Sequence, residues 1–205
     1  MSIPRITEIL EQYDGGKSIV AGTALIGKVS IDQATANANE VVTKSGSVVA
    51  VNSNAGKSSA SVTRPNDATP YGINDVVGGL LTFADVLPAS QQFIITAVNQ
   101  RIDVATVPVG MGGFRLHLYD AEPTAIADNA AFNVAAADRS KYIGYIQLAA
   151  PADIGDTLWS QNDGINMNGK LAAASTSLYG ILTTDNAYTP SNLAVKTVTI
   201  YAVGV

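Results

Sequence analysis

The sequence predicts an all-β protein: an antiparallel β-sandwich of the jelly-roll type, preceded by an extended N-terminal arm that carries a short helix. Two observations lead to this prediction. After residue 61, several segments alternate apolar and polar residues with the period of a half-buried strand, and turn residues separate them. Before residue 61, the chain has a single aromatic residue, Tyr13. Aromatic side chains bury the most apolar area, so residues 1–60 have little with which to build a core.

The arm begins with an expected amphipathic helix over residues 4–13. Ile6, Ile9, Leu10 and Tyr13 follow the i, i+3, i+4, i+7 spacing of one helix face, and two glycines follow. Ten residues are too few for a stable helix alone in water. We therefore expect this face to dock, either on the protein's own domain or on a partner.

The rest of the arm has small and β-prone residues. Residues 19–31 and 40–51 are rich in Val and Ile, and the second segment is typical of a hairpin. Residues 52–61 are predicted to be a linker, which divides the chain into an arm at 1–60 and a sandwich at 61–205. In the first segment, the residues expected to contact a partner are Leu25, Ile26, Val29 and Ile31.

Strands are predicted over residues 93–104, 114–119, 142–148, 178–183 and 195–203. Strict alternation in the first of these would place Ile94, Thr96 and Val98 on one face, with Phe93 and Ile95 on the other. Residues 121–137 are predicted to be a long loop with at most one helical turn. Residues 161–170, with the sequence QNDGINMNGK, are interpreted as a hairpin turn or, alternatively, as a weak cation site.

Composition excludes several functional classes. Charged residues make up 14% of the chain, and the net charge of −5 comes entirely from residues 61–205. With no basic cluster to meet phosphates, we expect no nucleic-acid partner. The chain has no cysteine, so it offers no disulfide or thiolate chemistry. It has no apolar run long enough for a signal peptide or membrane span, so no membrane partner is expected.

Catalytic and cofactor motifs are weak. Gly56-Lys57-Ser58 ends like a phosphate-binding loop, but position 51 is Val51 where that loop needs glycine, so a linker is preferred. His117, the single histidine, is interpreted as a surface or sheet-face residue. The carboxylate pairs all fall in turn-like segments: Asp120 and Glu122, Asp128 and Asp138, Asp153 and Asp156. We therefore expect no enzyme, metal or cofactor.

Exposed aromatic residues leave a second class open, because β-sandwiches can present aromatic side chains to sugars. The candidates for a glycan-facing surface are Trp159, Tyr145 and Tyr188. Alternation places Tyr142 and Tyr145 on opposite faces of their strand, so one of them should point outward.

Several segments resemble virion structural proteins of tailed bacteriophages. These are TALIGKVSIDQ at 23–33, the boundary at 62–65, QRIDVATVPVGMGGFRLHLYDAEPT at 100–124, and ADNAAFN and DRSKYIGYIQL within 127–148. The resemblance covers most of the chain and carries no catalytic motif. It implies a capsid decoration (cement) protein that clamps major capsid protein subunits on the head surface, present in the host cytoplasm during assembly. The alternative is a glycan- or receptor-binding head fibre or tail accessory module.

An arm that crosses to a neighbour also suits a closed homo-oligomer, and a trimer is favoured.

Overall fold

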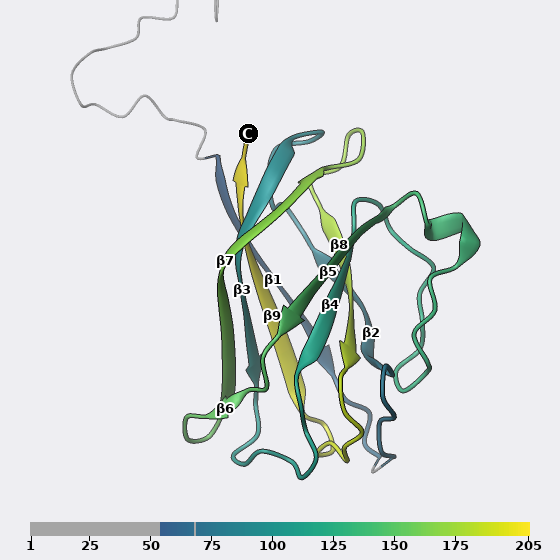
Figure 1. Ribbon diagram of the computed structural model, residues 1–205, viewed down its shortest axis with the longest axis vertical. Helices are drawn as coiled ribbons and strands as arrows, with labels where there is room; N and C mark the ends of the chain where they lie inside the picture. The colour runs from purple at the N-terminus through teal and green to yellow at the C-terminus, as the bar shows by residue number, and fades with distance from the viewer. Residues whose placement is uncertain (1–53, 68) are drawn as a thin grey trace, which may run out of the picture. The chain divides into compact units, whose positions relative to one another are not determined.

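The computed structural model describes residues 54–67 and 69–205, all of which belong to one unit of the chain. Within these residues, nine strands form two antiparallel sheets (Figure 1). The five-stranded sheet has the order β1-β9-β3-β7-β6, and the four-stranded sheet has the order β2-β8-β4-β5. The strands are β1 (Ala55–Thr63), β2 (Val76–Phe83), β3 (Gln92–Ile102), β4 (Phe114–Tyr119), β5 (Tyr142–Leu148), β6 (Ala152–Asp153), β7 (Leu158–Lys170), β8 (Leu178–Thr184) and β9 (Val195–Gly204).

The strand order is that of a jelly roll, which confirms the predicted fold class. Apart from the two-residue β6, each sheet contains four long strands, β1-β9-β3-β7 and β2-β8-β4-β5. Along these eight strands every connection crosses to the opposite sheet, except the one between β4 and β5. Two interleaved Greek keys of this kind define the jelly roll.

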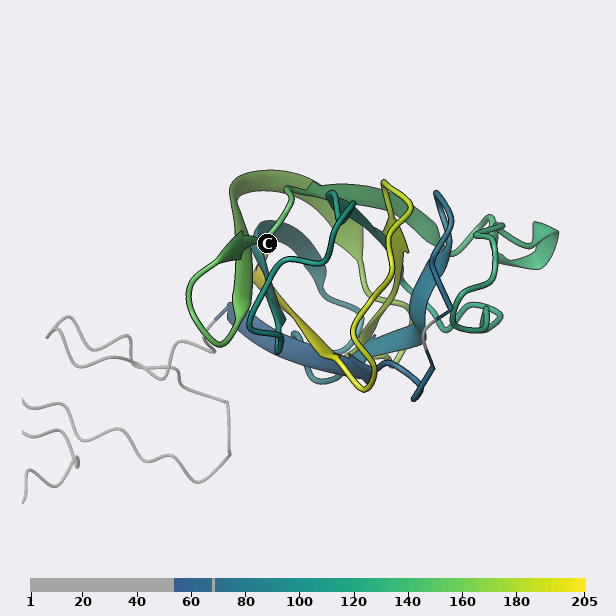
Figure 2. The ribbon, with the colours of Figure 1, turned by 90° about the horizontal axis from the view of Figure 1, so that it is seen from below.

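The view along the strands shows the two sheets facing one another (Figure 2). One apolar core of buried side chains fills the space between them. Phe114, Leu116 and Leu118 point inward from β4, as their alternation predicts, and each is fully buried. They meet Val198 and Ile200, which face them from β9 of the other sheet. Burial of such side chains contributes about 1.5–3 kcal/mol each, which makes this core the main source of stability.

The first strand lies where a linker was expected. Residues 55–63 pair with β9 along their whole length, from Ala55 opposite Val203 to Thr63 opposite Val195. Ser58 and Ala60 point into the sandwich, while Ser59 and Ser61 bond to Thr199 and Thr197 on the outer side. The linker prediction for residues 55–61 is therefore wrong, because small polar residues suit an edge strand that packs on one side only. The helix, hairpin and partner-binding residues predicted before residue 54 lie outside the described residues, and the division at residue 60 stays a prediction.

The predicted turn at 161–170 is also wrong. These residues belong to β7, which runs for 13 residues beside β3. The turn-like residues mark a bulge instead: Asp163 pairs with Ala97 and Met167 with Ile95, so residues 164–166 face Thr96 alone. Gly164 has φ of 71°, a conformation that favours glycine. The alternative interpretation, a weak cation site at this segment, stays a prediction.

Two bulges change which side chains share a face. The bulge opposite Thr96 changes the alternation of inward and outward side chains along β3. Phe93, Ile95 and Val98 are therefore all buried in the core. In β5, Leu118 pairs with Gly144 but Tyr119 pairs with Tyr142, which leaves Ile143 as the extra residue. The predicted separation of Ile95 from Val98, and of Tyr142 from Tyr145, is wrong for this reason.

The connection between β4 and β5, residues 120–141, crosses the outer face of the four-stranded sheet to reach β2. Backbone bonds hold it there, from Val76 N to Ala130 O at 2.8 Å and from Asn129 N to Val76 O at 2.8 Å. Its single helical turn, Ala136–Asp138, confirms the predicted loop. Among the described residues, no helix is long and apolar enough to cross a bilayer.

Candidate binding surfaces

The structure separates the three aromatic residues predicted to face a glycan. Trp159 lies on β7, with its side chain on the outer face of the five-stranded sheet. Tyr145 lies on β5 of the other sheet and is 54% exposed. Tyr188 is 3% exposed and packs against Tyr71 and Phe114, so the expectation that it faces a glycan is wrong. Trp159 and Tyr145 thus belong to different surfaces.

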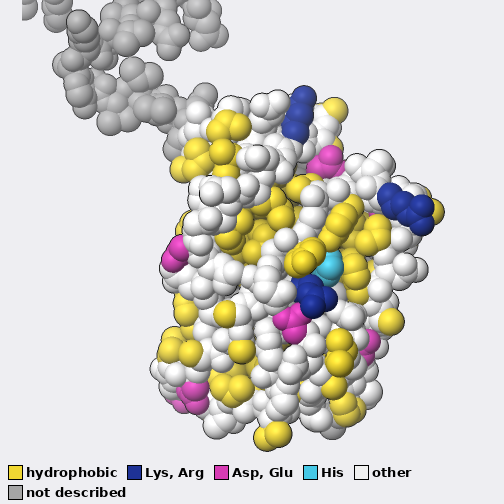
Figure 3. All heavy atoms as spheres, viewed as in Figure 1, with side chains coloured by type: hydrophobic (Ala, Val, Ile, Leu, Met, Phe, Trp, Pro, Cys, Tyr) yellow, Lys and Arg dark blue, Asp and Glu magenta, His cyan; other side chains and the backbone are white. Residues whose placement is uncertain are grey.

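Tyr145 is part of an aromatic cluster on the outer face of the four-stranded sheet, formed by Arg115, His117, Phe132, Tyr142 and Tyr145. The Phe132 ring, from the 120–141 connection, stacks on His117 with centroids 3.9 Å apart. The centroids of Tyr142 and Tyr145 lie 6.0 and 5.8 Å from that of His117. Figure 3 shows the histidine in the middle of an apolar area with basic and acidic groups beside it.

His117 occupies the sheet face, as predicted, but it is covered and only 7% exposed. Its Nδ1 lies 3.0 Å from the Tyr142 hydroxyl and its Nε2 lies 3.2 Å from Thr183 Oγ1. Burial, with a smaller contribution from the nearby charge of Arg115, lowers the pKa of His117 from 6.5 to about 4. The ring is therefore neutral at pH 7, and both of its nitrogens have hydroxyl partners. This arrangement fixes the ring as part of the cluster.

A polar rim holds the exposed side of the cluster in place. The Arg115 guanidinium lies over the Tyr145 ring, 5.9 Å from its centroid. It forms an ion pair from Nε to Asp185 Oδ1 at 3.1 Å and donates from Nη1 to Asn74 Oδ1 at 3.0 Å. Gln147 donates to the other oxygen of Asp185. Tyrosine and arginine are both enriched in protein-binding hot spots.

A buried ionic network joins the 120–141 connection to Arg64, which follows β1, and to Gly78 of β2. The fully buried Arg64 donates to Asp128 Oδ2 at 2.7 Å and to Asp67 Oδ1 at 2.5 Å. The other Asp128 oxygen accepts from the Tyr71 hydroxyl at 2.7 Å and from Gly78 N at 2.6 Å. Burial and the adjacent carboxylate raise the pKa of Tyr71. Because Asp128 accepts from groups on three segments, the network ties the connection to the sandwich.

Two other carboxylates that were considered as members of pairs, Asp138 and Asp153, also have local partners. Asp138 accepts from Lys141 Nζ at 2.8 Å and from Thr124 N at 2.9 Å, and these bonds lower its pKa to about 2. Asp153 accepts from Gly155 N at 2.9 Å, within its own turn. Asp128 and Asp138 therefore serve different networks. Among the described residues, no three His, Cys, Asp or Glu side chains come together in a metal-binding group.

Sequence reasoning missed the apolar end of the sandwich. Four connections meet at the lower end in Figure 1: those leading from β1 to β2, from β3 to β4, from β5 through β6 to β7, and from β8 to β9. They carry most of the exposed large apolar side chains among the described residues: Ile73, Val107, Val109, Ile154 and Leu193. No sequence pattern identified them, because four separate loops become neighbours only through the strand order. Exposed apolar side chains gathered in one place are typical of a contact surface.

Comparisons with known proteins give weak similarities. No protein-family model matches the chain, and no curated protein matches it. One similar solved chain is from a structure of a marine algae virus of the order Picornavirales, with 12% identity, TM-score 0.29, and coverage of 100% of this chain and 88% of that chain. Another is from a nora virus structure, with 13% identity, TM-score 0.21, and coverage of 72% and 60%. The assignment of the jelly roll depends on the strand order and not on these matches.

Proposed function

We propose that this protein is a non-enzymatic structural component of a virus particle: a decoration protein that binds and clamps major capsid protein subunits on the head surface. The observation that carries the proposal is the jelly-roll strand order of the two sheets. This architecture is used by viral capsid domains, and also by lectins and cupins. The segments that resemble virion proteins of tailed bacteriophages favour the first of these groups.

The arrangement of the buried polar groups supports a structural role. Arg64 and Tyr71 both donate to Asp128 inside the fold, and His117 lies within hydrogen-bond distance of two hydroxyl groups. A catalytic acid or base needs to reach a substrate from its position. Asp128 instead connects the 120–141 segment to Arg64 and to Gly78 of β2, and His117 connects β4 to β5 and β8, so these groups hold the fold together.

Attachment to the particle is assigned to the arm. The helix face of Ile6, Ile9, Leu10 and Tyr13 would bury apolar area on a capsid subunit. The β-prone segment with Leu25, Ile26, Val29 and Ile31 would add strand pairing at the edge of a neighbouring sheet. In a trimer, each arm would cross to a neighbouring subunit, which would close the assembly over a local three-fold axis of the capsid.

A reconstitution experiment tests this proposal. Purified protein is mixed with particles that lack it, and bound protein is measured after the particles are sedimented. We expect saturable binding that the double variant Ile9→Asp/Leu10→Asp abolishes. The matched control, Glu8→Ala/Glu11→Ala, changes two residues of the same predicted helix that lie off its apolar face, and it should bind normally. Protein that binds host cells and not these particles would contradict the proposal.

A further inference from the structure

The outer face of the five-stranded sheet has a polar hollow that the proposed function does not use. Strand register places outward-facing side chains in rows across this sheet: Thr199, Asn99 and Gln161 form one row, and Tyr201, Ala97 and Asp163 form the next. Trp159 lies two residues before Gln161 on the same face of β7. We refer to Asn99, Trp159, Gln161, Asp163 and Tyr201 as the polar face.

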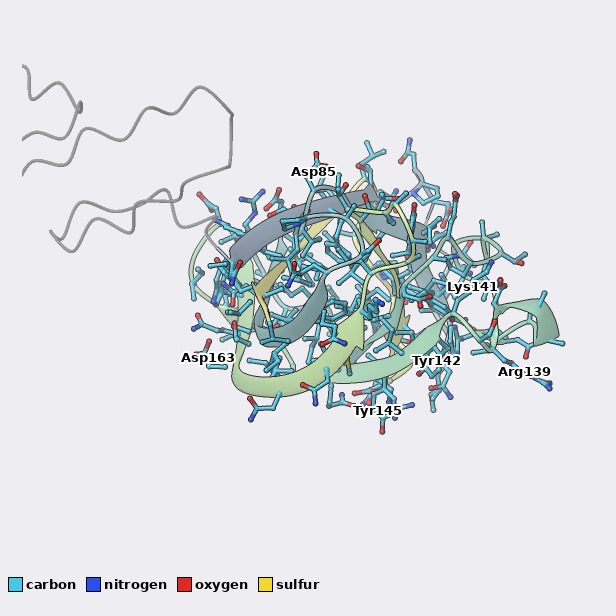
Figure 4. All side chains as sticks on the ribbon, turned by 90° about the horizontal axis from the view of Figure 1, so that it is seen from above. Asp85, Arg139, Lys141, Tyr142, Tyr145 and Asp163 are labelled. Carbon is cyan, nitrogen blue, oxygen red and sulfur yellow. The ribbon has the colours of Figure 1, made fainter. Side chains whose placement is uncertain are left out.

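The β7 bulge creates the hollow. Residues 164–166 oppose a single residue of β3, so β7 bends next to Asp163 instead of continuing straight across the sheet. The small side chain of Ala97 lies between the larger Tyr201 and Asp163 of its row. The result is a cavity of about 290 Å³ lined by Thr96, Ala97, Asn99, Gln161, Asp163 and Tyr201. Figure 4 shows Asp163 and Tyr145 pointing outward on different sides of the sandwich, so the two surfaces are independent.

The polar groups of the hollow are held in position and leave bonding capacity for a ligand. Gln161 Nε2 donates to Asp163 Oδ2 at 2.7 Å, and Asn99 Nδ2 lies 3.4 Å from the Tyr201 hydroxyl. Asp163 is exposed, and among the described residues none donates to its other carboxylate oxygen, Oδ1. This oxygen can therefore accept from a ligand hydroxyl.

The charges around the polar face balance. Lys57 Nζ lies over the Tyr201 ring, 5.7 Å from its centroid. Arg101, which pairs with Trp159 across the strands, has an ion pair with Asp103 at 2.8 Å. Two cations thus accompany two carboxylates, Asp103 and Asp163. A ligand that carries net charge gains little attraction here, so the surface favours a neutral ligand over an anion such as phosphate.

We propose that the polar face binds a neutral oligosaccharide. Sugars present hydroxyl groups that both donate and accept, which match the amides of Asn99 and Gln161 and the carboxylate of Asp163. They also present apolar C–H faces that stack on the rings of Tyr201 and Trp159. Tyr201 lies on β9 and Trp159 on β7, with β3 between them, so the two rings are about 10 Å apart across the strands. Their rows are four residues apart, which adds about 13 Å along the strands. That separation suits several linked sugars better than one.

Titration of the full-length protein with defined saccharides tests the proposal. The probes are neutral linear tetrasaccharides (maltotetraose, cellotetraose and chitotetraose), with a sialylated and a sulfated oligosaccharide as charged comparisons, and binding is followed by calorimetry. We expect at least one neutral probe to bind with Kd near or below about 1 mM. Trp159→Ala and Gln161→Ala should each weaken that binding by about tenfold or more, since both change outward-facing side chains.

The matched control is Tyr145→Ala, which removes an exposed aromatic side chain from the other sheet and should bind the probe normally. Circular dichroism and the unfolding midpoint check that each variant is folded. The proposal is overturned if no neutral probe binds, if only charged probes bind, or if Tyr145→Ala loses binding while Trp159→Ala keeps it. Self-association that Trp159→Ala abolishes, without sugar binding, would assign the face to protein contact. None of these outcomes depends on attachment to particles.

Discussion

The buried His117 should make the sandwich less stable in mild acid. The ring is neutral in the fold, where its pKa is about 4, and the pKa of an exposed histidine is 6.5. As the pH falls below 6.5 the unfolded state takes up a proton first, so the free energy of unfolding decreases until the pH reaches about 4. Each unit of pKa difference corresponds to about 1.4 kcal/mol. Between pH 7 and pH 5 the expected loss is about 2 kcal/mol.

Urea unfolding at pH 7 and at pH 5 measures this loss directly. The lowered pKa of Asp138, about 2 against 3.8, affects stability only in more acidic solution, so Asp138 does not contribute to the change between pH 7 and pH 5. The control is His117→Gln, whose amide can still bond to Tyr142 or Thr183 but does not titrate. The variant should be less stable at pH 7 by about 1 kcal/mol and should lack the dependence between pH 7 and 5. Equal pH dependence in both proteins would refute the account of His117.

Three further predictions concern the buried charges and the arm. Lys196 is 2% exposed, and burial lowers its pKa from 10.5 to about 8. Lys196→Met should therefore stabilise the protein at pH 7 by on the order of 2 kcal/mol. In urea unfolding, the variant should also lack the rise in the free energy of unfolding between pH 8 and 10.5. Asp128→Asn should destabilise by about 3 kcal/mol, because it takes a countercharge from the buried Arg64; an unchanged unfolding midpoint would show that the ion pair does not stabilise the fold. Ile9→Asp/Leu10→Asp should abolish binding to particles and leave the unfolding midpoint unchanged, and a lowered midpoint would instead place the helix in the core.

Period-two alternation predicted the strands that are regular, and it failed where a strand contains a bulge. The β4 residues from Phe114 to Tyr119 alternate without interruption, and each lies on its predicted face. In β3 the irregularity at Thr96 shifts the phase, and in β7 it was interpreted as a turn because Gly164 and its neighbours are also typical hairpin residues. A bulge and a turn use the same local conformations, so only the pairing partner distinguishes them.

Sites that depend on several segments were not visible in the sequence. Arg64 and Asp128 are 64 residues apart, and they meet because the 120–141 connection crosses the sheet to β2. The apolar end likewise combines residues from four loops. Trp159 was a candidate for a glycan-facing surface, but its neighbours on the polar face, Asn99 and Tyr201, come from β3 and β9. Such combinations follow from the strand order, which alternation alone does not determine.

The proposed attachment to the particle is tested most directly by comparing electron cryo-microscopy maps of particles with and without this protein. The account predicts additional density on the head surface, with a sandwich-sized module resting on major capsid protein and an extended segment of the arm lying across a neighbouring subunit. The density should disappear when particles are reconstituted with Ile9→Asp/Leu10→Asp. Density confined to the tail, or contact with the head made through the sandwich without the arm, would contradict the account.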